Sequence, residues 1–124
     1  MMKKRISYEC LLVNGPVKEK VKYKEIGDHY EVKGVHHISF EVEGKPMHIQ
    51  YDDTHVHLVN DQSVLHFNKD MRVPNKYTLP YGVVELHTKV ISLEYREGTM
   101  KFIYELYDHE HLVTQADMMV YYSD

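Results

Sequence analysis

Apolar and polar residues alternate with a period of two along most of the chain. Residues 17–24 alternate valine and tyrosine with lysine, and residues 35–42 and 47–51 show the same alternation. This pattern is typical of β-strands, whose successive side chains point to opposite faces of a sheet. No window has the spacing and caps of an amphipathic helix, so the pattern predicts an all-β chain.

The first well-defined hairpin is predicted around a turn at residues 43–46, which contain glycine and proline. A loop of four residues sets Val42 opposite Met47 and, further along, Ile38 opposite Tyr51. One face of the hairpin is then apolar and the other polar, as expected of a correct register.

A second hairpin is predicted around residues 60–63. Pairing Val59 with Val64 places His57 directly opposite His66, and again separates an apolar face from a polar one.

The C-terminal third continues the alternation, with a shift of apolar parity at residues 90–91 that predicts a β-bulge. Further turns are predicted at residues 96–98 and 108–111. About eight to ten short strands with polar turns and no crossovers predict an antiparallel meander β-barrel. No linker or internal repeat divides the chain, so residues 1–124 form one predicted domain.

The segment from Tyr77 to Thr88, with Pro80, Tyr81 and Gly82 at its turn, resembles the signature of the YwiB-like bacterial family, a domain of unknown function. The strands at 102–106 and 118–122 also fit the layout of that family. The resemblance implies a calycin-like barrel, of the broad kind that includes lipocalins and fatty-acid-binding proteins. It implies no activity and no catalytic residues, and the chain has no tryptophan for the Gly-x-Trp signature of true lipocalins.

Charge and composition exclude some classes of protein. The net charge is −4, and the excess of lysine and arginine is confined to the first 24 residues, so we do not expect nucleic-acid binding. No apolar run approaches the length of a membrane span, and the basic start is followed by a stretch too short and polar for export. With Cys10 as the lone cysteine, we expect a cytoplasmic protein without disulfides.

The predicted interior supports a ligand-binding hypothesis. A barrel of about eight strands is either filled by side chains or holds one small ligand, and both alternatives stay open. Arg72 is the arginine expected to hold a carboxylate, because Arg5 and Arg96 lie at a terminus and a turn. The apolar residues predicted to line the lumen are Ile38, Phe40, Ile49, Tyr51, Val56, Leu58, Phe67, Phe102 and Tyr104.

Ten histidines raise a metal-binding hypothesis. His55 and His57 lie two apart on one predicted strand and share a face, and His66 lies across from His57. Two such histidines and one from the neighbouring strand can bind zinc and leave one position open.

No catalytic motif is present, so we expect a non-enzymatic protein that needs no cofactor other than such a zinc ion. The first hypothesis is a barrel that binds a small apolar or amphipathic molecule. The alternatives are a protein-interaction module with a filled core, which binds a protein partner or a second copy, and the histidine metal site.

Overall fold

The computed structural model describes residues 3–60 and 63–124, with the backbone alone at 78–79, and this part of the chain contains ten strands and no helix. The strands are β1 (Lys3–Asn14), β2 (Val17–Val32), β3 (Val35–Val42), β4 (Lys45–Tyr51), β5 (His55–Asn60), β6 (Ser63–Asn68), β7 (Val73–Leu79), β8 (Gly82–Arg96), β9 (Thr99–Asp108) and β10 (His111–Ser123).

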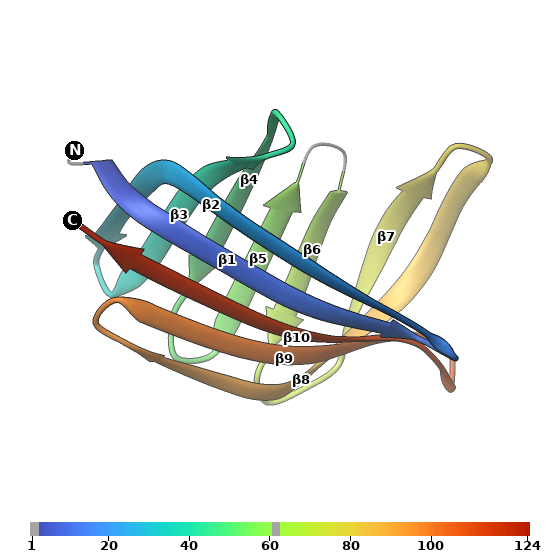
Figure 1. The fold of residues 1–124 in the computed structure, drawn as a ribbon. Helices are drawn as coiled ribbons and strands as arrows, with labels where there is room; N and C mark the ends of the chain where they lie inside the picture. Colours follow the sequence, from blue (N-terminus) through green and yellow to red (C-terminus); the bar gives the residue numbers. More distant parts are fainter. Residues whose placement is uncertain (1–2, 61–62) are drawn as a thin grey trace.

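All ten strands belong to one antiparallel sheet with the order β6-β5-β4-β3-β2-β1-β10-β9-β8-β7. The sheet curls into a nearly closed barrel, in which the first and last strands are neighbours and the two chain ends lie together (Figure 1). The predicted antiparallel meander barrel is therefore confirmed.

The barrel closes between the edge strands β6 and β7, which share no backbone ladder within the described residues. Instead, the side-chain oxygen of Asn75 accepts a hydrogen bond from the His66 N–H (2.7 Å), and its Nδ2 donates to the His66 carbonyl (3.1 Å). The hydroxyl of Thr88 donates to the same carbonyl at 2.6 Å. The side chains of Asn75 and Thr88 are both buried. The amide of Asn75 thus takes the place of a paired backbone residue where β6 meets β7, a junction that we call the seam.

Apolar side chains from seven strands fill the interior, as the alternation predicts. In the middle of the barrel, the rings of Phe67, Phe102 and Tyr104 pack with centroids 4.8–5.1 Å apart. Cys10 is buried among these side chains, and burial raises the pKa of its thiol.

The predicted register of the first hairpin is wrong by two residues. The turn consists of Glu43 and Gly44 alone, both with positive φ, so Val42 pairs with Lys45. Two-residue turns of this kind match the right-handed twist of the strands better than a four-residue loop. A shift of two residues keeps every side chain on its predicted face, which is why the interior was still predicted correctly.

The second hairpin has the predicted register, with Val59 opposite Val64 and His57 opposite His66. Of the turn predicted at residues 60–63, positions 61 and 62 lie outside the described residues. The bulge predicted at residues 90–91 is confirmed, because the ladder between β8 and β9 shifts there.

Strand β2 parts from β3 at Gly27. It pairs with β1 from Val17 to Asp28, and with β3 only from Asp28 to Val32. A Cβ atom on Gly27 would lie 2.2 Å from the carbonyl oxygen of Ser39, so only glycine fits at this crossing. The separation of the two strands opens hollows in this wall of the barrel.

Candidate functional site

The nine residues predicted to line a lumen all lie in the barrel interior. None is more than 7% exposed, and they pack against one another. The middle of the barrel is thus occupied by the side chains that the ligand hypothesis assigned to its lining.

Arg72 does not join these nine residues. Its guanidinium lies over the ring of Tyr107, 4.4 Å from the centroid, and donates to the His109 carbonyl at 2.8 Å. A carboxylate oxygen of Glu110 lies 3.8 Å away. Arg72 therefore connects the loop before β7 to the β9–β10 turn on the outside of the barrel.

The histidine trio is brought together in part. The rings of His57 and His66 meet across β5 and β6 with centroids 4.5 Å apart, whereas His55 is engaged by Thr54 (2.7 Å) and Asn68 (3.4 Å). Within the described residues, no three His, Cys, Asp or Glu side chains are placed to hold one metal ion. Desolvation, followed by the neighbouring His66 and His55, lowers the pKa of His57.

A hollow of about 700 Å³ lies at the end of the barrel where β1 begins and β10 ends. A stack of aromatic and imidazole rings, which we call the end cluster, lies beside it, and His29, His36, Tyr95 and Tyr122 of this cluster line the hollow. The ring centroids of Tyr122 and His29 are 4.0 Å apart, and those of His36 and Tyr51 are 4.9 Å apart. The cluster consists of His29, His36, Tyr51, Tyr95 and Tyr122.

The strands explain how this cluster forms. His36 and Tyr51 are directly paired residues of β3 and β4, and Tyr122 comes from the last strand, two places along from β2. His29 Nε2 and His36 Nδ1 are 3.2 Å apart, which is a hydrogen-bonding distance. Five side chains from five strands thus converge on one end of the barrel.

Two titratable groups of the end cluster are desolvated. The hydroxyl of Tyr51 is buried and makes no hydrogen bond of good geometry within the described residues, and the polar group that interacts with it is the side chain of Tyr122. Burial raises the pKa of Tyr51, and the neighbouring tyrosines add to this effect. Desolvation, then the neighbouring His36 and Lys4, lowers the pKa of His29. Uncharged, partly desolvated groups therefore face this end of the barrel.

Charged residues surround the hollow. Lys4 forms an ion pair with Asp124, and His36 Nε2 lies 3.4 Å from a carboxylate oxygen of Glu31. The side chain of Arg96 lines the hollow and makes no hydrogen bond or ion pair with the described part of the chain. A cation without an internal partner is thus available at the rim.

The sequence contained a partial signal for this site. The parity of β3 places His36 on the same face as the buried Ile38, so one imidazole could have been assigned to the interior. The contact of His36 with Tyr51 could not be predicted, because the four-residue loop predicted for this hairpin paired Tyr51 with Ile38 instead.

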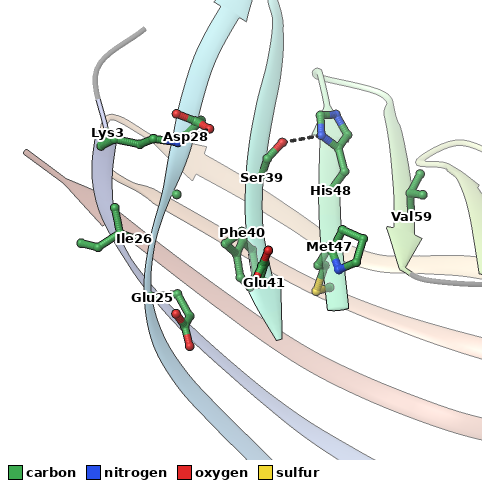
Figure 2. Close-up of a pocket in the computed structure, with 12 residues that line it drawn as sticks. Lys3, Glu25, Ile26, Asp28, Ser39, Phe40, Glu41, Met47, His48 and Val59 are labelled. Atoms are coloured by element: carbon green, nitrogen blue, oxygen red, sulfur yellow. Dashed lines mark hydrogen bonds and ion pairs between the residues drawn. The ribbon is translucent and has the colours of Figure 1, made fainter. Parts of the chain in front are cut away.

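A second hollow, of about 490 Å³, lies in the wall where β2 parts from β3. Figure 2 shows Ser39 and His48 pointing toward each other across β3 and β4, with a distance of 2.6 Å between the Ser39 hydroxyl and His48 Nδ1. The other nitrogen, His48 Nε2, lies 3.1 Å from His37 Nδ1. At the opposite side of the hollow, Lys3 pairs with Asp28 at 3.1 Å.

No protein-family model and no curated protein sequence matches the chain. Among solved structures, it is similar to the crystal structure of the ywiB protein from Bacillus subtilis, with a TM-score of 0.74 and 12% identity over 98% of this chain and 92% of that chain. No helix long and apolar enough to cross a membrane occurs among the described residues. The resemblance predicted from the segment Tyr77–Thr88 is thus confirmed for the architecture, and the chain is YwiB-like in its fold.

Proposed function

We propose that the protein is a non-enzymatic binding protein that takes a small amphipathic molecule with an anionic head at the end of its barrel. The observation that carries this proposal is the hollow of about 700 Å³, which combines an aromatic wall with the guanidinium of Arg96, a group without a partner among the described residues. Small-molecule sites typically have volumes of about 300–1,000 Å³ and combine apolar walls with a few polar groups.

Four side chains of the hollow have a role in this proposal. The rings of Tyr95, Tyr122 and His29 contact the apolar or planar part of the molecule. Arg96 pairs with the anionic head, since a guanidinium matches a carboxylate or sulfonate with paired N–H donors. The ligand lies at the barrel end, because the middle is filled by packed side chains. We assign the protein to the cytoplasm, where its single buried cysteine stays reduced.

A protein-interaction module is the alternative function, favoured by exposed apolar side chains on the outer wall. Ile26 is 62% exposed and Tyr121 42% exposed, and both line a shallow hollow of about 400 Å³ on β1, β2 and β10. Exposed apolar groups that gather in this way mark contact surfaces for a protein partner or a second copy.

The test is a fluorescence titration with 1-anilinonaphthalene-8-sulfonate, a planar amphipathic anion, on the folded full chain. Replacing Arg96 with Gln removes the proposed partner of the sulfonate, so we expect affinity to fall by about tenfold or more, as for the loss of one hydrogen bond to a charged group. Arg72→Gln is the matched control, because Arg72 is engaged on the outer surface, and its affinity should stay within twofold of the unaltered chain.

Circular dichroism and thermal melting establish that each variant is folded before the titration is interpreted. The proposal is contradicted if the folded chain does not bind the probe, or if Arg72→Gln weakens binding more than Arg96→Gln does. In either case, a concentration-dependent increase in mass in light scattering would favour the interaction module.

A further inference from the structure

Two imidazoles on the outer wall face each other through nitrogen atoms. His37 belongs to β3 and His48 to β4, and their Nδ1 and Nε2 atoms lie 3.1 Å apart with the rings inclined by 52°. Two nitrogens bound to one tetrahedral metal ion at 2.0–2.1 Å are separated by roughly 3.3 Å. The spacing already present in the protein is therefore close to that required of two ligands of one ion.

Ser39 lies against the pair, and its hydroxyl oxygen is at hydrogen-bonding distance, 2.6 Å, from His48 Nδ1 (Figure 2). In the tautomer that a metal site requires, the N–H at Nδ1 donates to Ser39 and the lone pair is on Nε2, on the side of His37. Histidine ligands usually have such an outer partner, which fixes the tautomer and the orientation of the ring. On metal binding, the proton that His37 Nδ1 shares with His48 moves to His37 Nε2, so both ligands stay neutral.

We propose that His37 and His48 bind a divalent transition-metal ion such as Zn²⁺ or Cu²⁺, oriented by Ser39. Imidazole nitrogens suit these ions. The remaining coordination positions are taken by water or by a donor atom of a bound molecule. This site is separate from the proposed function at the barrel end and does not depend on it.

The surroundings of the pair favour a cation. Tyr30 stacks on His37, with ring centroids 4.6 Å apart and planes inclined by 8°, which restrains that ring. Glu25 and Glu41 line the same hollow as His48 and contribute negative charge there, whereas Asp28 at its opposite side is paired with Lys3 (Figure 2).

The other two cross-strand histidine pairs provide the comparison. The rings of His57 and His66 meet nearly edge to face, at 83°, and no hydrogen bond joins their nitrogens within the described structure. The nitrogens of His29 and His36 are 3.2 Å apart, but Tyr122 stacks on the first ring and Tyr51 on the second. Of the three pairs, His37 and His48 combine facing nitrogens, an outer-shell hydroxyl and an adjacent hollow.

The first experiment locates the ion on the unaltered chain, without an affinity tag. A ¹H–¹⁵N correlation spectrum is recorded with substoichiometric Cu²⁺, whose unpaired electron broadens nearby amide signals. We expect broadening to be centred on residues 37–39 and 47–49. Broadening centred on His57 and His66, or on His29 and His36, would overturn the assignment, as would the absence of selective broadening.

The second experiment measures Zn²⁺ binding by calorimetry. We expect one ion per chain, an affinity loss of tenfold or more for His48→Gln, and a loss of about tenfold for Ser39→Ala, the range typical of outer-shell partners. His57→Gln is the matched control and should retain the affinity within twofold. An unchanged affinity in folded His48→Gln would contradict the proposal, and if that variant does not fold, the copper experiment on the unaltered chain still decides it.

Discussion

The middle and the end of the barrel interior are built by the same strands but differ in chemistry. In the middle, Phe67, Phe102 and Tyr104 pack ring against ring among aliphatic neighbours. At the end, histidines and tyrosines form the wall of a hollow, and the Tyr51 hydroxyl makes no hydrogen bond of good geometry within the described residues.

This difference indicates that the middle of the barrel serves stability and that its end serves binding. Burial of apolar surface in the middle stabilises the fold, at about 25 cal/mol per Å². A buried polar group without a partner costs free energy, so the end cluster is explained poorly by stability and better by a function. The comparison predicts that changes in the middle act on stability and changes at the end act on binding.

The largest expected effect is from Phe102→Ala in the middle. Phe102 is fully buried between two other aromatic rings, so the free energy of unfolding should fall by about 3–5 kcal/mol. Urea unfolding followed by circular dichroism measures this change. If the variant is folded, its affinity for the anilinonaphthalene probe should be unchanged. A marked loss of affinity would contradict the assignment of stability to the middle and of binding to the end.

A smaller loss of stability is expected from a substitution at the seam between β6 and β7. Asn75→Ala removes the partner of the His66 N–H and one of the two donors to its carbonyl, so unfolding free energy should fall by about 2 kcal/mol. Asn60→Ala, at an exposed position, is the control and should change stability by less than about 0.5 kcal/mol. Equal effects of the two substitutions would show that Asn75 does not hold the seam.

Mild acidification should lower stability through three partly buried histidines. Desolvation lowers the pKa values of His29, His48 and His57 in the folded protein, so the unfolded chain binds protons more readily. Their contribution is complete above the unfolded value, about 6.5, and is lost as pH falls from there toward the lower folded values. Urea unfolding at pH 7.5 and 5.5 tests this, and equal or greater stability at pH 5.5 would contradict it.

The smallest expected effect on stability is that of Tyr51→Phe at the end. Because the hydroxyl makes no hydrogen bond of good geometry within the described part of the chain, its removal should leave stability unchanged or raise it by up to about 1 kcal/mol. Tyr95→Phe is the contrast, since its hydroxyl donates to Asp53 and its loss should not stabilise. A clear destabilisation by Tyr51→Phe, seen in thermal melts, would mean that the hydroxyl is satisfied in solution.

The fold could be predicted from the sequence because its main determinant is the period-two alternation. This pattern placed Ile38, Ile49 and Phe67 in the interior whatever the turn length, since a slip of two residues preserves the face. Asn75 could not be assigned in this way. Its role depends on strands β6 and β7 meeting in space, which local periodicity does not report.

The candidate site could be predicted less well. The sequence indicated a ligand-binding barrel rich in tyrosine and histidine, but Arg96 looked like a turn residue and Arg72 like the ligand partner. The positions of these two arginines depend on tertiary structure. The β8–β9 turn places Arg96 at the hollow, and Arg72 is bound to the β9–β10 turn. Likewise, the pairing of His37 with His48 is diagonal, and sequence spacing does not reveal diagonal neighbours.

The most direct test of the binding account is to map the anilinonaphthalene probe onto the protein by amide chemical shifts in a ¹H–¹⁵N correlation spectrum. The account predicts that the largest shifts occur at the barrel end, at His29, His36, Tyr95, Gly98 and Tyr122. Shifts concentrated at Phe67, Phe102 and Tyr104, or on the outer wall at Ile26 and Tyr121, would contradict it.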